Sequence, residues 1–227
     1  MIRKAKNPRK GADLKELAHR VVEIIRRLEE RYPNPRTALS FSNPLELLVA
    51  TVLSAQCTDE RVNQVTPSLF SKYRTPWDYA NADLGKLEEE VRPTGFYRQK
   101  ARTLQAIGKA LVEKFQGRVP GTLEELVSLP GVGRKTANLV LSEAFGIPGI
   151  VVDTHVQRVS RRIGLTQEDD PEAIEYDLME ICPREDWSKL SNLLIWHGRK
   201  TCVARKPKCG SCDIRELCQY PDKTGSV

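Results

Sequence analysis

The stretch Leu129-Pro130-Gly131-Val132-Gly133-Arg134-Lys135 predicts a tight connection between two helices. Glycine is used where the backbone φ angle is positive or where another group approaches the backbone closely, which suits Gly131 and Gly133. Free N–H groups in such a loop, with the positive end of the next helix dipole, form an anion site that needs no side chain. A DNA phosphate fits this site, because phosphate contacts position a protein without reading base sequence. An ordinary helix–helix turn is the alternative.

Lys135 lies in the first turn of the helix predicted after these glycines. A nucleophilic amine must be unprotonated, and at an ordinary pKa of about 10.4 only roughly one lysine in a thousand is neutral near physiological pH. Desolvation and the positive end of a helix both lower the pKa of a lysine. The pattern therefore favours a catalytic amine over a solvated helical lysine.

A second candidate group follows in Val152-Asp153-Thr154-His155. Asp153 is predicted to be the N-cap of a helix that runs to Gly164. A capping carboxylate stays ionised and fixed in place, so Asp153 can also stabilise a developing positive charge near an active amine. His155 either orients this carboxylate or is merely a helix residue, and both interpretations stay open.

Four of the six cysteines form a C-x6-C-x2-C-x5-C pattern close to the C-terminus: Cys202, Cys209, Cys212 and Cys218. In a reducing cell this crowding indicates metal or cluster ligation rather than disulfides. Four thiolates suit either zinc or an iron–sulfur cluster. Zinc ribbons usually contain two C-x2-4-C pairs, whereas this pattern contains one.

The segment from 199 to 208 carries five basic residues and no acidic one: Arg199, Lys200, Arg205, Lys206 and Lys208. We predict that the loop from Cys202 to Cys209, with Arg205 and Lys206, contacts phosphates; a solvated charge run is the alternative. The whole chain has a formal net charge of +6, which also favours a polyanionic partner.

The 227 residues fit one large or two small domains, and 40% of them are hydrophobic, which argues against disorder. Apolar residues recur at helical spacing and no two runs pair as strands, so we predict an all-α protein. Residues 45–53 are apolar almost all round, which is typical of a central buried helix. No apolar run reaches transmembrane length and no signal peptide is recognisable, so we expect a soluble intracellular protein without a membrane partner.

The glycine hairpin with Lys135, followed by Val152 to His155, resembles the helix-hairpin-helix DNA glycosylase superfamily. The cysteine spacing resembles its endonuclease III branch, whose four cysteines hold a [4Fe-4S] cluster. Two further blocks, Ser-Ala-Gln-Cys-Thr-Asp at 54–59 and Thr-Gly-Phe-Tyr at 94–97, match that branch as well. The resemblance covers residues 15 to 221.

The resemblance implies an enzyme that removes oxidised pyrimidines from double-stranded DNA and cuts the strand at the abasic site. Lys135 is then the nucleophile that attacks the sugar C1′ and forms a Schiff base before β-elimination. Asp153 stabilises the oxocarbenium-like sugar or assists proton transfer. Alternatives are a monofunctional mismatch glycosylase, whose adenine-specific members generally lack this lysine, and a non-catalytic iron–sulfur DNA-binding protein.

The target nucleotide has to leave the base stack, and the resemblance implies two residues that fill the hole. Gln56 is similar to the residue whose amide hydrogen-bonds to the orphaned base. Phe96 is similar to an apolar wedge that unstacks the neighbouring step, although the family often has leucine there. Packing into the core beside Tyr97 is the alternative for Phe96.

The resemblance also implies two helical lobes. Residues 37–147 are expected to form a six-helix lobe ending in the hairpin, and residues 1–36 with 148–227 a cluster lobe, so that Lys135 and Asp153 face each other across a cleft. We expect a monomer that acts on DNA with damaged pyrimidines or abasic sites. A prokaryotic cytoplasm, in association with the nucleoid, is the expected location.

Overall fold

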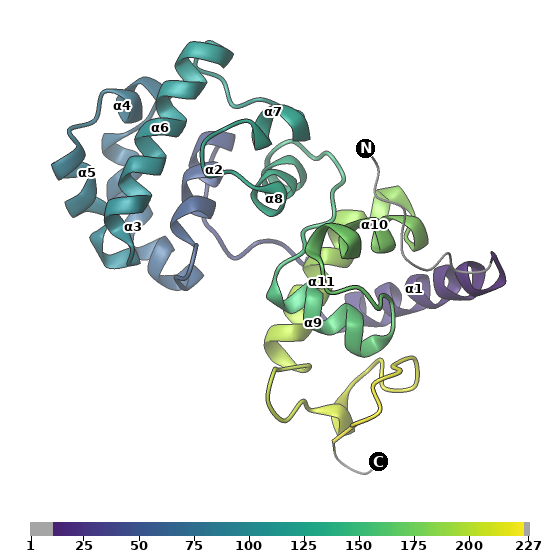
Figure 1. Ribbon diagram of the computed structural model, residues 1–227. Coiled ribbons are helices and arrows are strands. Elements are labelled where there is room, and N and C mark those ends of the chain that lie inside the picture. The colour runs from purple at the N-terminus through teal and green to yellow at the C-terminus, as the bar shows by residue number, and fades with distance from the viewer. Residues whose placement is uncertain (1–10, 225–227) are drawn as a thin grey trace. The chain divides into compact units, whose positions relative to one another are not determined.

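The structure is a computed structural model that describes residues 11–224, and the chain forms two compact units (Figure 1). The hairpin unit is Thr37–Ile147, and the cysteine unit combines Met1–Arg36 with Pro148–Val227, of which 11–36 and 148–224 are described. Residues 11–224 contain helices and no strand, which confirms the predicted all-α class. No helix in that range has both the length and the apolar character needed to cross a membrane.

The hairpin unit is built around α2 (Pro44–Leu53), which contacts α3, α6 and α8. Its buried residues lie on all sides of the helix, as its nearly unbroken apolar sequence predicts. Asn43 caps α2 by accepting the N–H of Glu46, and Pro44 occupies the first turn. The other elements of this unit are α3 (Asp59–Lys72), α4 (Pro76–Ala80), α5 (Leu84–Val91), the 3-10 turn η1 (Arg92–Thr94), α6 (Tyr97–Phe115), α7 (Leu123–Val127) and α8 (Arg134–Ala144).

The hairpin unit contains one α-helix more than the six expected, because α4 was not predicted. Five residues are too few to show a helical period. The signal that was present is a capping box: Thr75 accepts the N–H of Asp78, and the Asp78 carboxylate accepts the N–H of Thr75.

The cysteine unit joins the N-terminal helix α1 (Gly11–Arg31) to the C-terminal part of the chain from Pro148 onward. Val21, Ile24 and Leu28 of α1 are fully buried in one core with residues of the later helices. Arg20 of α1 donates hydrogen bonds to the carbonyl oxygens of Ile163, Gly164 and Leu217. The other elements are α9 (Thr154–Ile163), α10 (Pro171–Ile181), the 3-10 turn η2 (Arg184–Asp186), α11 (Trp187–Lys200) and the 3-10 turn η3 (Cys209–Ser211).

Candidate functional site

The glycine hairpin joins α7 to α8 and is held by buried residues on both sides of the turn. Leu129 and Val132 are buried, and the N–H of Val132 donates to the carbonyl oxygen of Leu129 at 3.2 Å. Gly131 has a φ of +73°, and a Cβ at this position would lie 2.7 Å from Cγ2 of Thr103. Gly133 differs, because its φ is −96° and a Cβ there would meet nothing within 4 Å. Of the two hairpin glycines, only Gly131 is therefore required for the fold of the hairpin unit.

Lys135 lies in the first turn of α8, a helix whose N-cap, Gly133, supplies no side-chain hydrogen bond. The side chain of the N-cap residue therefore does not compete with an anion for the first N–H groups of α8. Lys135 is exposed. The sequence pattern led us to expect desolvation of this amine, but the hairpin unit by itself does not bury it.

Asp153 is the N-cap of α9, as predicted. Its Oδ1 atom accepts the backbone N–H groups of both His155 and Val156, each at 2.8 Å. The residue is half-buried. These two bonds fix the carboxylate at the positive end of the helix, where a negative charge is stabilised.

His155 is half-buried next to this cap, and its Nδ1 atom lies 3.1 Å from Nη2 of Arg158. The guanidinium of Arg158 can only donate, so this contact is a hydrogen bond in the tautomer whose Nδ1 atom carries no proton. Burial lowers the pKa of His155, while Asp153 opposes the shift. A Cβ at Gly198 would lie 2.9 Å from Cβ of His155, so this histidine packs α9 closely against α11.

Gln56 and Phe96 share a backbone conformation that is uncommon for their residue types. Their φ angles are +52° and +48°, and both residues are exposed. The Phe96 side chain is 66% exposed, so the alternative in which it packs into the core is wrong. A left-handed, exposed aromatic residue is costly in both backbone and solvation terms, and such positions concentrate at functional sites.

The four clustered cysteines are all free thiols, each half-buried: Cys202, Cys209, Cys212 and Cys218. Burial raises the pKa of Cys212 to about 11, and electrostatic interaction with the other three cysteines also raises it. No group of three or more His, Cys, Asp or Glu side chains in residues 11–224 is arranged to hold a single metal ion. The four thiols therefore share a neighbourhood without closing around one ion.

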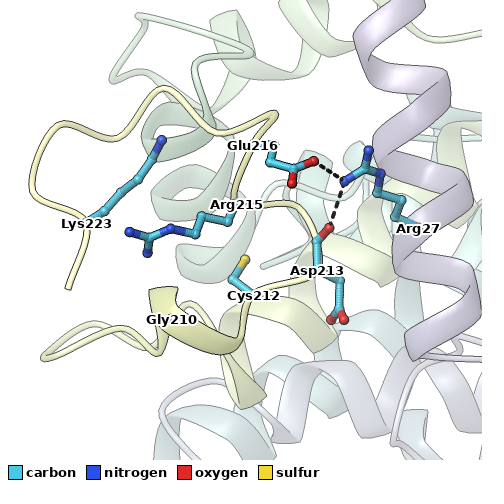
Figure 2. A pocket seen from close by; sticks show the side chains of 7 residues that line it. All are labelled: Arg27, Gly210, Cys212, Asp213, Arg215, Glu216 and Lys223. Atoms are coloured by element: carbon cyan, nitrogen blue, oxygen red, sulfur yellow. Dashed lines mark hydrogen bonds and ion pairs between the residues drawn. The ribbon is translucent and has the colours of Figure 1, made fainter. Parts of the chain in front are cut away.

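N–H groups lie beside two of the four sulfurs, and a histidine ring nitrogen lies beside a third. Arg162 donates to Sγ of Cys202 at 3.6 Å, the N–H of Tyr220 donates to Sγ of Cys218 at 3.4 Å, and Nε2 of His197 lies 3.6 Å from Sγ of Cys212. Cys212 also lines a cavity of about 420 Å³, together with other residues of the C-terminal segment and Arg27 of α1 (Figure 2). A bound iron–sulfur cluster keeps its ligands deprotonated, and N–H groups near the sulfurs stabilise that charge. This donor set fits a four-cysteine cluster.

The basic loop, residues 202–209, is held by two arginines of α9. Arg162 donates to the carbonyl oxygens of Val203 and Ala204 at 2.8 and 2.9 Å. Arg158 donates to the carbonyl oxygen of Cys202 at 3.2 Å. Arg205 and Lys206 at the tip are exposed, and Lys206 has a φ of +53°. The loop thus presents two cations from a fixed backbone.

Among the cationic residues that bind backbone carbonyls, sequence reasoning missed Arg158 and Arg162, which hold the basic loop, and Lys100. Lys100 is only 5% exposed, and its ammonium donates to the carbonyl oxygens of Leu53 and Thr94. The available signal was a lysine next to Ala101, on the face of α6 that carries its buried apolar residues.

Comparison with known proteins agrees with this geometry. Residues 49–184 match the HhH-GPD superfamily of base excision DNA repair proteins. The endonuclease III of Synechocystis sp. is 50% identical over 92% of this chain and 95% of its own length, and that of Bacillus subtilis is 46% identical over 88% and 94%. The solved structure of a trapped endonuclease III–DNA covalent intermediate matches with a TM-score of 0.85 and 46% identity, covering 89% of this chain and 95% of that chain. This chain belongs to the endonuclease III family within the HhH-GPD superfamily.

Proposed function

We propose that this protein is a bifunctional DNA glycosylase and abasic-site lyase that removes oxidised pyrimidines from duplex DNA. The observation that carries the proposal is Lys135, an exposed amine in the first turn of a helix that follows a glycine hairpin, in a chain of this family. The covalent endonuclease III–DNA intermediate among its structural neighbours supports a covalent route.

In the proposed reaction, Nζ of unprotonated Lys135 attacks C1′ of the damaged nucleotide, and the base departs with the electrons of the glycosidic bond. Ring opening gives a Schiff base between the lysine and C1′. Loss of a proton from C2′ then expels the 3′ phosphate by β-elimination, which cuts the strand. Asp153 stabilises the positive charge on the sugar or takes part in proton transfer. Bound DNA covers the exposed amine and supplies the desolvation that the hairpin unit lacks.

We assign the DNA contacts to three parts of the chain. The N–H groups of the hairpin at Gly131 and Gly133 bind a phosphate, and the open space at Gly133 allows its close approach. Arg205 and Lys206 of the basic loop bind further phosphates. Gln56 and Phe96 enter the stack where the nucleotide has left it, Gln56 toward the orphaned base and Phe96 as the wedge.

Cys202, Cys209, Cys212 and Cys218 would hold a [4Fe-4S] cluster. Its contribution is structural, since it ties both ends of the basic loop to the cysteine unit. Iron and sulfide content per purified chain tests this assignment, and stoichiometric zinc in their place would overturn it. We expect action as a monomer on the nucleoid of a prokaryotic cytoplasm, and the bacterial origin of the relatives supports the cellular location.

Borohydride trapping tests the catalytic proposal. The protein is incubated with duplex oligonucleotides that contain one thymine glycol or one abasic site, with and without borohydride. We expect strand cleavage and a covalent adduct, and loss of the adduct in Lys135→Gln but not in Lys114→Gln, which changes an exposed lysine of α6.

Each rival predicts a different result of this assay. Base release without an adduct identifies a monofunctional glycosylase. Binding without base release or adduct identifies a non-catalytic DNA-binding protein. An undiminished adduct in Lys135→Gln assigns the nucleophile to another residue.

A further inference from the structure

Lys100 is a buried cation for which the proposed reaction has no use so far. It lies in the first turns of α6 and is 5% exposed. Lysine is among the residues least often buried, because an ammonium group removed from water must find other partners. Burial lowers the pKa of Lys100, and interaction with Cys57 opposes this shift. The burial of the Lys100 ammonium group therefore requires an explanation.

The partners of Lys100 are the C-terminal ends of two helical elements that are far apart in sequence. Its ammonium donates to the carbonyl oxygen of Leu53, the last residue of α2, at 2.8 Å. It also donates to the carbonyl oxygen of Thr94, the last residue of η1, at 2.8 Å. Carbonyl groups at helix ends lack intrahelical donors, and a cation there forms charge-assisted hydrogen bonds.

Each of these helix ends is followed directly by one of the two residues that we propose to enter the base stack. Residues 54–57 continue from Leu53 to Gln56 through a turn closed by the N–H of Cys57 on the carbonyl oxygen of Ser54 at 3.1 Å. Residues 95–96 continue from Thr94 to Phe96. The backbone N–H of Lys100 donates to the carbonyl oxygen of Phe96 at 3.1 Å. Lys100 therefore contacts the residue before each loop with its side chain, and Phe96 itself with its main chain.

We propose that Lys100 is a positioning residue that sets the spacing of Gln56 and Phe96, so that both enter the base stack together. The inference rests on the proposed insertion of these two residues. The lysine orders both loops before DNA binds, so that the conformational entropy of ordering them is not lost during extrusion. It also keeps Gln56 and Phe96 in the left-handed backbone conformation, which an unrestrained loop would not maintain.

Extrusion is measured with 2-aminopurine placed beside a thymine glycol in duplex DNA, whose fluorescence rises on unstacking, in single-turnover stopped flow. Lys100→Met removes the donors at similar length, and Lys100→Gln keeps a shorter donor. Lys109→Met, which changes an exposed lysine of the same helix, is the matched control. We expect extrusion to slow by roughly ten- to a hundredfold in Lys100→Met, by less in Lys100→Gln, and not in the control. If Lys100→Met does not fold, Lys100→Gln decides alone.

A second readout separates positioning from general damage. Borohydride trapping on a single-stranded abasic oligonucleotide needs Lys135 but no extrusion from a duplex. We expect it to be unchanged in the Lys100 variants, and an equal loss in both assays would overturn the inference. In a Gln56→Ala, Phe96→Ala background, Lys100→Met should slow extrusion no further; an additive loss would also overturn it.

The two proposals fail in different ways. If Gln56→Ala and Phe96→Ala extrude at the wild-type rate, the proposed insertion is wrong, and the role of Lys100 falls with it. If they slow extrusion while Lys100→Met and Lys100→Gln do not, only the inference about Lys100 is wrong.

Discussion

Asp153 accepts the backbone N–H of Val156 through Oδ1 at 2.8 Å, and this bond begins α9. The same oxygen accepts the N–H of His155. One side chain therefore caps a helix and presents a carboxylate in a fixed place. The capping role needs an oxygen acceptor, whereas the proposed catalytic role needs a negative charge, so the two roles can be separated by substitution.

Asp153→Asn should abolish most of the activity without weakening the fold. Asparagine caps helices about as well as aspartate, so the free energy of unfolding should change by less than about 0.5 kcal/mol. Loss of the charge should slow the single-turnover rate on thymine glycol DNA by about 10²- to 10³-fold. Asp153→Ala is the control for the cap and should cost about 1 kcal/mol of stability. A wild-type rate in Asp153→Asn would leave Asp153 with the capping role alone.

Helices of this protein are predictable because their capping residues and their apolar spacing are both local features of the sequence. Asp153 caps α9 as predicted, and the apolar run of residues 45–53 lies in the buried helix α2. The failure at α4 has the same origin, because a helix of five residues is defined by its cap alone.

The candidate site residues could be proposed from their type and spacing, but their exposure and conformation could not be predicted. Lys135 was expected to be desolvated and is exposed, and Phe96 was open between wedge and core and is exposed. Neither property is encoded near these residues, because exposure depends on which distant segments cover them. The bond from Lys100 to Leu53 spans 47 residues and leaves no periodic trace in the sequence.

Substitution of the two hairpin glycines should separate folding from DNA binding. Gly131→Ala forces a Cβ into a left-handed conformation and against Thr103, so it should cost about 1–2 kcal/mol of stability. Gly133→Ala meets open space, and the gain in chain stiffness offsets the weaker N-cap to within about 0.5 kcal/mol. It should still weaken duplex binding about tenfold, because the methyl group stands where the phosphate approaches. Denaturant titration and fluorescence anisotropy measure the two effects, and unchanged affinity in Gly133→Ala would remove the phosphate from this site.

Neutralising the tip of the basic loop should change the salt dependence of binding rather than its specificity. If Arg205 and Lys206 each contact one phosphate, removing either should reduce the slope of log K against log salt by about 0.9. Affinity for damaged and undamaged duplexes should fall by the same factor. Lys86→Ala, at an exposed position of α5, is the control. An unchanged slope in both loop variants would show that Arg205 and Lys206 are exposed to solvent and do not contact phosphates.

The conformation of the basic loop depends on a fork that only arginine provides. Arg162 donates through Nη1 to Val203 and through Nη2 to Ala204, so one planar group holds two consecutive carbonyl oxygens. Lysine at this position keeps the charge but presents a single ammonium group on a flexible stem, which does not reproduce the fork.

Arg162→Lys should therefore loosen residues 202–209 at constant net charge. Losing one hydrogen bond of about 1 kcal/mol should weaken duplex binding by about fivefold. Hydrogen exchange should speed up in the loop, notably at the N–H of Lys208, which donates to the carbonyl oxygen of Thr201. Arg161→Lys, at the exposed neighbouring position of α9, should change neither quantity. Faster exchange with unchanged affinity would mean that DNA orders the loop on binding, and that Arg162 contributes nothing to recognition.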